Sequence, residues 1–588
     1  MLGCFFWVIS RELGHFKISV TRHMDLQSQT TIFYFILFYS FFLRLESTWW
    51  NTSSRQKCQS PPSRCWEDNK CCSKANYFTN FSAPPRISRL KGREVYDAKG
   101  QLSIEAELFC IVCSKEKSMS SAAVSSHLAP KEISLDWKAT SQERAKHVLT
   151  GLQWINGPLN SMLKDQNPCD QLEVDHILSN FFMARYLEKK DILDREKQEN
   201  CSHSGSDEAL HSLPPVQTKD KKSTDKGKKS SAAEKSFPPA EPPELVLCGS
   251  LAIGSVSLAV AKTGAKIQGT PLYKYIAALK NREVPTKLHI PVPLVTLLSC
   301  GKTSPGKLRL LEEVILIPKV GQRVNQIITM TLELQKEMAR IMNTATKAGA
   351  TQVTVCDRGA LAVSCEKPEQ PLDLIIEACT VLELPLGTEM HLALNCAAPD
   401  LMDYSKGKYE IATGVLKSPD ELVDMFQTLI SKYPAVVALI DPFRREDTDQ
   451  WEKLRNAIGG SCTLLSDITY KSQAPPPPGA RGHVIKHIHE TTISDLVRMT
   501  SEHQGAVLMG ATGSEPCSDD SLSDIAVGLG LDYVKLGGLS GSERMTKYNR
   551  LISIEEELVQ QGILVSKEKH PPPLFPEKKN TGAACYCV

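Results

Sequence analysis

Between Ile290 and Val565, short apolar runs alternate with amphipathic segments. The apolar runs are continuous rather than alternating in hydrophobicity, which is typical of strands buried on both faces of a parallel sheet. Candidate strands begin at Ile315, Gln352, His391, Ala435, Thr463, His483, Ala506 and Tyr533. Candidate helices begin near Ser418, Asp449, Thr492, Asp519 and Gly541. Strands and helices that alternate over this length predict a parallel sheet closed into a (β/α)8-type barrel.

The composition changes along the chain and divides it into four parts. We expect the barrel at 291–566 and a smaller α+β domain at 86–290, preceded by an extension of unknown status at 1–85 and followed by a flexible tail at 567–588. Residues 202–244 are rich in Ser, Lys and Pro, with seven lysines between Lys219 and Lys235. Such a stretch buries too little apolar area to offset its chain entropy, so we expect a disordered insert there.

The extension and the overall charge limit the classes of partner. The longest apolar run, Ile32 to Leu43, has twelve residues, whereas a bilayer-spanning helix needs about 20. Lys and Arg total 69 against 67 Asp and Glu, a net charge of +2, which does not favour nucleic acid. No aromatic residue is interleaved with the lysines of the insert. We therefore expect neither a membrane span nor a nucleic-acid partner.

Of the 19 cysteines, those from Cys248 to Cys462 are mostly single residues inside apolar runs, such as Cys356 and Cys396. This usage is typical of reduced cysteines in a cytoplasmic protein. Cys58, Cys65, Cys71 and Cys72 lie closer together, but they lack a His or a second Cys-x-x-Cys at zinc-site spacing. The pattern therefore favours neither a disulfide framework nor a zinc site.

Polar residues follow several of the predicted barrel strands, where active sites of such barrels lie. They are Asp357, Arg358, Asn395, Asp441, Asp467, Lys486 and Lys535. Each one alone could be an ordinary solvated loop residue. Two lysines at one barrel mouth are more informative, because burial and mutual repulsion lower the pKa of at least one of them toward the range of a general base.

Several motifs together resemble the enolase family over most of residues 93–566. They are Val95-Tyr-Asp-Ala-Lys-Gly100, Ser250 to Lys262, Ile290-Pro-Val-Pro293, Leu439-Ile-Asp-Pro-Phe443 and Gly541 to Leu551. The long insert and the atypical N-terminus make the chain similar to a divergent, sperm-type vertebrate branch of that family. The resemblance implies an enolase barrel, preceded by a smaller α+β N-terminal domain.

The resemblance also implies an activity, the interconversion of 2-phosphoglycerate and phosphoenolpyruvate in glycolysis, with magnesium as cofactor. Lys486 matches the family's base, and Lys535 matches the lysine that holds the substrate carboxylate. Glu313 matches a glutamate that lines the substrate pocket. The implied partners are a small phosphorylated carboxylate and, as family norm, a second enolase subunit in a homodimer or heterodimer. The implied location is the cytoplasm, with the sperm flagellum as a more specific site.

The chain departs from the family at positions that hold the metal. Asn395 and Ile440 replace two carboxylates, and Asp467 is the remaining acid of a metal-binding pair. Arg358 occupies the position of the acid that assists the leaving group, and Gly510-Ala-Thr-Gly513 replaces the motif that grips phosphate. A neutral amide and an isoleucine do not replace two negative charges, so magnesium binding is expected to be weak or absent.

Two hypotheses of different classes therefore stay open. The first is an active phosphopyruvate hydratase that uses Lys486, Lys535, Glu313 and magnesium. The second is a catalytically impaired, enolase-derived structural or scaffolding protein of the sperm flagellum, because a fold does not guarantee the chemistry of its family.

Overall fold

The computed structural model describes residues 84–124, 137–203, 246–302, 304–345, 354–467, 476–502, 506–512, 515–517, 519–570 and 574–575. Most of the predicted extension and of the predicted insert lies outside these ranges, as do the cysteines at positions 58 to 72. Within the described part of the chain, we find no helix long and apolar enough to cross a bilayer.

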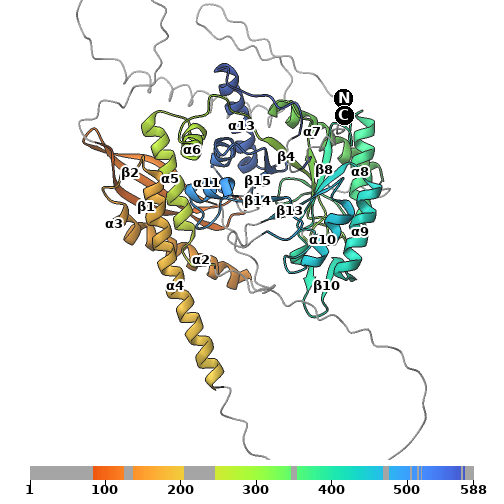
Figure 1. The fold of residues 1–588 in the computed structure, drawn as a ribbon, viewed down its shortest axis with the longest axis horizontal. Coiled ribbons are helices and arrows are strands. Elements are labelled where there is room, and N and C mark those ends of the chain that lie inside the picture. Colours follow the sequence, from red (N-terminus) through yellow and green to blue (C-terminus); the bar gives the residue numbers. More distant parts are fainter. Residues whose placement is uncertain are drawn as a thin grey trace, which may run out of the picture. The chain divides into compact units, whose positions relative to one another are not determined.

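The N-terminal domain is an antiparallel sheet covered by helices (Figure 1). The sheet consists of β1 (Arg86–Tyr96), β2 (Leu102–Val112) and β3 (Lys115–Ala122). The helical elements are α2 (Trp137–Trp154), the π-helix η1 (Ile155–Leu159), α3 (Asn160–Leu163), α4 (Gln171–His203), α5 (Leu251–Gln268) and α6 (Leu272–Asn281). Helix α5 is buried on nearly all sides because its residues are small or apolar. A methyl group at Gly254 would lie 2.5 Å from the carbonyl oxygen of His489, so this position requires glycine.

Eight strands close into a barrel, as predicted. In barrel order they are β4 (Val292–Ser299), β5 (Glu313–Ile317), β8 (His391–Asn395), β12 (Val436–Ile440), β13 (Thr463–Asp467), β14 (Gly482–Ile485), β15 (Ala506–Gly510) and β16 (Tyr533–Gly537). The barrel closes where β16 pairs with β4, with Tyr533 beside Val292. The prediction of a wholly parallel sheet is wrong at one strand, because β5 runs antiparallel to both β4 and β8.

The apolar run at Gln352 is not a barrel strand, which corrects the prediction. Its described residues form β6 (Thr354–Val355), which makes a short hairpin with β7 (Leu361–Ala362). This β6–β7 hairpin attaches to the edge of β4, where Leu298 pairs with Leu361. The run beginning at Val292 takes the expected place in the barrel. Asp357 and Arg358 therefore lie in a hairpin turn and not at the end of a barrel strand.

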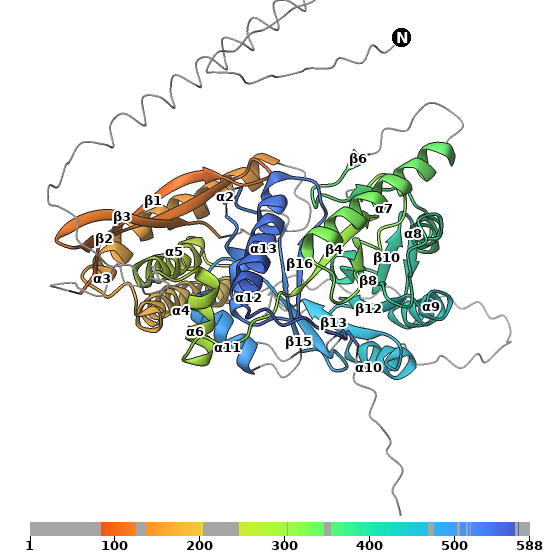
Figure 2. The same cartoon turned by 90° about the horizontal axis from the view of Figure 1, so that it is seen from above.

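Helices cover the outside of the barrel strands, and Figure 2 shows α8, α9 and α10 along one side. These helices are α7 (Val324–Ala345), α8 (Glu369–Val381), α9 (Pro419–Lys432), α10 (Thr448–Ile458), α11 (Ile493–Glu502), α12 (Ser521–Gly528) and α13 (Ser542–Gln560). The connection after β8 adds the 3-10 helix η2 (Ala398–Leu401) and a small sheet of β9 (Met402–Asp403), β10 (Lys408–Ala412) and β11 (Val415–Lys417). Helix α9 begins at the predicted place, with a capping box formed by Ser418 and Glu421.

The barrel interior is filled by side chains, with a contribution from the C-terminal segment. Leu574 is 3% exposed and belongs to the same apolar cluster as the interior residues Val292 and Tyr533. The Phe575 ring stacks on His570, with 4.5 Å between ring centroids. The segment 567–588 was predicted to be a flexible tail, but its described residues at 574–575 pack against the barrel because they are apolar.

Candidate active site at the barrel mouth

Six polar or substituted positions project into the mouth of the barrel. Side chains alternate along a strand, so residues two apart face the same side. The interior cluster contains Ile315, Ala393, Ala438, Leu465, Val484 and Tyr533. Each of these six residues has a neighbour two positions along the chain that faces the same way and lies at the mouth. These neighbours are Glu313, Asn395, Ile440, Asp467, Lys486 and Lys535. The strand register thus gathers Asn395, Asp467, Lys486 and Lys535, which were predicted from strand ends, while Arg358 arrives from the β6–β7 hairpin.

Glu313 lies between two cations. Its carboxylate accepts a hydrogen bond from Lys535 Nζ at 2.5 Å and forms an ion pair with the Arg358 guanidinium. Burial alone would raise the pKa of Glu313, but Lys535 and Arg358 overcome this effect and hold it well below its usual range. Burial lowers the pKa of Lys535, an effect that Glu313 partly opposes. The lowered pKa of Lys535 agrees with the prediction that at least one of the two lysines has a lowered pKa. Its main cause is burial, and repulsion from Lys486 contributes less.

Arg358 is placed by close backbone contacts of its hairpin. Gly538 N donates to the Arg358 carbonyl oxygen at 2.8 Å. A methyl group at Gly538 would lie 2.1 Å from the Gly359 carbonyl oxygen, so only glycine allows the hairpin to approach this closely. Arg358 also pairs with Glu312 at 2.9 Å. The guanidinium therefore bridges two carboxylates at the place where the resemblance implies an acid.

Lys486 is held by a carboxylate of the neighbouring strand. Its Nζ donates to Asp467 Oδ2 at 2.5 Å, and the two side chains are 11% and 13% exposed. The Asp467 amide donates in turn to Asp441 Oδ1 at 3.0 Å. Asp441 has φ of 46°, a strained conformation for a residue with a side chain. Burial, and then the neighbouring Asp467, raise the pKa of Asp441 to about 8.

The residues at the implied metal positions do not fit magnesium. Asn395 lies between Glu313 and Ile440 in the strand register and offers only a neutral amide. Ile440 is 2% exposed and offers no oxygen ligand at all. Asp467 is already paired with Lys486. The described residues contain no group of three His, Cys, Asp or Glu side chains that could hold a metal ion. Because magnesium requires several oxygen ligands and compensating negative charge, no chemical step at this site is routed through it.

Two contributors to the site were not singled out from the sequence. Glu312 supplies the second carboxylate to Arg358, and the pair of adjacent acids before an apolar run was the available signal. Lys99 of the N-terminal domain pairs with Asp357 at 2.6 Å and so helps to hold the hairpin turn. A contact between residues this distant in the chain has no local sequence signal.

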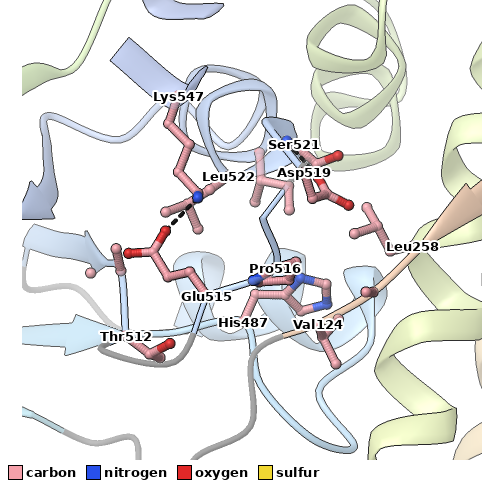
Figure 3. Close-up of a pocket in the computed structure, with 14 residues that line it drawn as sticks. Val124, Leu258, His487, Thr512, Glu515, Pro516, Asp519, Ser521, Leu522 and Lys547 are labelled. Carbon is pink, nitrogen blue, oxygen red and sulfur yellow. Dashed lines mark hydrogen bonds and ion pairs between the residues drawn. The ribbon is translucent and has the colours of Figure 1, made fainter. Parts of the chain in front are cut away.

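A small cavity of about 40 Å³ lies beside the mouth, next to Gly510, Ala511 and Thr512 (Figure 3). Among its described lining residues the only lysine or arginine is Lys547, which forms a buried ion pair with Glu515. Burial lowers the pKa of the lining His487 to about 4, so its ring is neutral at pH 7. The Thr512 hydroxyl is buried and has no hydrogen-bond partner among the described groups. Among the described lining residues, this wall therefore offers no unpaired lysine or arginine where the resemblance implies a grip on phosphate.

The raised pKa of Asp441 predicts a pH-dependent contribution to stability. An unfolded aspartate titrates near 4, so between about pH 4 and 8 the folded chain binds more protons at this group. The contribution of Asp441 to the free energy of unfolding is fully present below about pH 4 and is lost as the pH rises through 8. Asp441→Asn keeps an acceptor for Asp467 N but does not titrate. We expect the stability of the native protein relative to this variant to fall with pH, by at most about 1.4 kcal/mol per pH unit.

Urea unfolding of both proteins between pH 5 and 8 measures this difference. The neutral His487 has the opposite pH dependence, because its contribution to the stability of the fold is lost as the pH falls. Both proteins contain His487, so this contribution cancels in the difference between them. Parallel stability curves for the two proteins would contradict the assignment to Asp441.

Comparisons with known proteins agree with the geometry. Residues 287–571 match the family model described as the enolase C-terminal TIM barrel domain. The chain is 46% identical over 512 residues to Enolase 4 of Danio rerio, an alignment that covers 85% of this chain and 88% of that protein. It is 42% identical over 531 residues to Enolase 4 of Homo sapiens, covering 84% of each chain. Enolase 4 of Xenopus laevis is 41% identical over 520 residues, with 86% and 89% covered.

Proposed function

The chain belongs to the enolase family, and from this premise we propose that it is an enolase-derived binding and scaffolding protein with weak or no turnover of 2-phosphoglycerate. The observation that carries the proposal is the internal pairing of the two lysines. Lys486 is engaged by Asp467 and Lys535 by Glu313, each at 2.5 Å. The site thus satisfies its own charges without a substrate or a metal.

The chemistry of the family explains why this pairing matters. Removal of a proton next to a carboxylate requires a free amine as base and concentrated positive charge for the enediolate that forms. Asn395 and Ile440 cannot hold the ion that supplies this charge. Arg358 is a fixed cation near the site, but Glu312 and Glu313 already neutralise it. The arrangement therefore supports binding of a small anion better than it supports turnover.

The ligand class that we propose is a small phosphorylated carboxylate, as in the rest of the family. Its carboxylate would take the place of Glu313 beside Lys535, because Glu313 keeps Arg358 as a second cationic partner. This exchange needs no metal ion. Titration calorimetry with phosphoenolpyruvate tests it, and we expect equal affinity with and without magnesium.

Turnover by the purified chain distinguishes the two hypotheses. We expect conversion of 2-phosphoglycerate near the background rate, both with magnesium and with a chelator present. Lys486→Ala is the decisive control, because loss of a general base typically costs 10² to 10⁴ in rate. Activity that survives in Lys486→Ala would identify a contaminating enolase. Magnesium-dependent activity that disappears in this variant would overturn the proposal.

The second candidate function is phosphopyruvate hydratase itself. It is favoured by one specific observation, that Lys486, Lys535 and Glu313 all project into the same barrel mouth. In this case Lys486 would act as base after release from Asp467, and Lys535 would hold the substrate carboxylate after release from Glu313. The same Lys486→Ala measurement decides between the candidates.

We also propose the cytoplasm, and within it the sperm flagellum, as the location, with a second enolase subunit as partner. The support is the resemblance to the sperm-type branch of the family and the family's usual dimeric state. Immunolocalisation in sperm and light scattering of the purified chain test the two parts separately. A monomer in solution would remove the subunit partner from the proposal.

A further inference from the structure

Two cysteines meet where β4 ends. Cys300 directly follows β4, and Cys365 follows β7, which pairs with β4. Val363 N donates to the Ser299 carbonyl oxygen at 3.1 Å, which sets the two segments side by side. Both cysteines are free thiols, 1% and 6% exposed, in one apolar cluster. Their side chains are hydrogen-bonded to each other, so they form the Cys300–Cys365 pair.

We propose that the Cys300–Cys365 pair is an oxidation site, which a hydroperoxide converts into an intramolecular disulfide. The hydrogen bond makes the two thiols unequal. It lowers the pKa of Cys365, which accepts, and it raises the pKa of Cys300 together with burial. Cys365 is the nucleophile because it is the more exposed of the two, at 6% against 1%, and so the one that a peroxide reaches first. A hydroperoxide is a small oxidant that can reach a thiol only 6% exposed, whereas a bulky disulfide acting as the oxidant cannot.

The chemistry proceeds in two balanced steps. The Cys365 thiolate attacks one peroxide oxygen, the O–O bond breaks, and the leaving hydroxide takes up a proton to become water. The Cys300 sulfur then attacks the sulfur of the resulting sulfenic acid, and the departing hydroxide takes the Cys300 proton as a second water. Two thiols and one hydrogen peroxide thus give one disulfide and two waters. The pair loses two electrons and the peroxide gains them.

The position of the pair connects its redox state to Arg358. Cys300 N donates to the Leu311 carbonyl oxygen at 3.0 Å, which fixes the strand exit beside the residues before Glu312. A methyl group at Gly301 would lie 1.8 Å from Glu312 Oε2, so the Glu312 carboxylate rests directly on the residue after Cys300. Glu312 in turn holds Arg358 at 2.9 Å. A disulfide at Cys300 therefore ties β4 to the segment that follows the β6–β7 hairpin. This inference does not depend on the proposed function.

The test uses the full-length reduced protein and hydrogen peroxide. After oxidation the remaining thiols are alkylated and the peptides are mapped by mass spectrometry. We expect a cross-linked peptide that contains Cys300 and Cys365 and is two hydrogen atoms lighter than its parts. Cys300→Ser should lack the cross-link and accumulate a Cys365 sulfenic acid, trapped by a 1,3-dione reagent. Cys365→Ser should show neither product. Cys379→Ser is the matched control, because Cys379 is equally buried in the same cluster, and it should keep the cross-link.

Two results would overturn the proposal. One is that the exposed Cys113 and Cys517 are oxidised while Cys300 and Cys365 remain separately alkylated. The other is that the cross-link forms only in urea, where the folded geometry is absent. Hydrogen exchange adds a readout of the coupling to the hairpin. We expect exchange at Thr354–Ala362 to slow after oxidation in the native protein and in Cys379→Ser, and unchanged exchange would refute the connection to Arg358.

Discussion

Glu313→Ala is expected to destabilise the folded protein by about 3 to 5 kcal/mol, the usual cost of removing one partner of a buried ion pair. Glu313 is 2% exposed and Lys535 is 6% exposed, so the variant leaves the Lys535 ammonium buried without its counter-charge. Arg358 suffers less, because Glu312 still pairs with it at 2.9 Å. Urea unfolding at pH 7 measures the change in the free energy of unfolding.

Two further variants show whether the loss comes from the buried charge. Glu313→Ala combined with Lys535→Met removes both charges and should recover most of the loss, because no buried ion remains unpaired. Glu389→Ala is the surface control, since its pair with Lys319 at 2.6 Å is about half exposed and should be worth less than 1 kcal/mol. An equal loss in Glu389→Ala, or no recovery in the double variant, would contradict this account.

The second large effect is expected when the missing carboxylates are restored. Asn395→Asp with Ile440→Glu returns two oxygen ligands beside Asp467. Because Ile440 is 2% exposed, the added glutamate should lower the melting temperature when magnesium is absent. Magnesium at about 100 times its dissociation constant should then stabilise the folded state by about 2.7 kcal/mol. At roughly 2 to 4 °C per kcal/mol, this is a clear rise in the melting temperature.

The unmodified protein is the control for this restored site, and we expect little or no rise from it. Adding Asp467→Asn to the double variant should weaken the response, because it removes the third carboxylate. A clear magnesium response in the unmodified protein that Asp467→Asn abolishes would show that the native site holds the ion. The enzyme hypothesis would then be preferred.

The barrel could be predicted because its strands are apolar on both faces. Val436–Ile440, for example, is buried at every position, which is typical of a strand covered on both faces, as in a barrel. The direction of β5 could not be read in the same way, since a run apolar on both faces looks alike in either direction. The segment between Ser299 and Glu313 does hold a signal, because it carries no helical pattern and parallel neighbours usually need a helical crossover.

The candidate site was predictable only where it depends on strand ends. Lys486 and Lys535 follow apolar runs, so their place at the mouth follows from the barrel alone. Their pairing with Asp467 and Glu313 depends on the strand register, which the apolar runs do not reveal. Arg358 was misplaced at a strand end because its run at Gln352 is as apolar as a barrel strand. The approach of Gly538 to the hairpin and the pair between Lys99 and Asp357 explain its final position.

The closure of the barrel between β16 and β4 has a consequence for synthesis on the ribosome. Val292 is made early in the barrel domain, but its partner Tyr533 and the packing residue Leu574 are made near the end. At about 5 to 20 residues per second, the edge of β4 waits on the order of tens of seconds for its neighbour. An unpaired apolar edge is a template for association with other chains. Chaperone binding during translation should therefore persist until residue 574 has left the exit tunnel, and nascent chains that stop before β16 should be the most prone to aggregate.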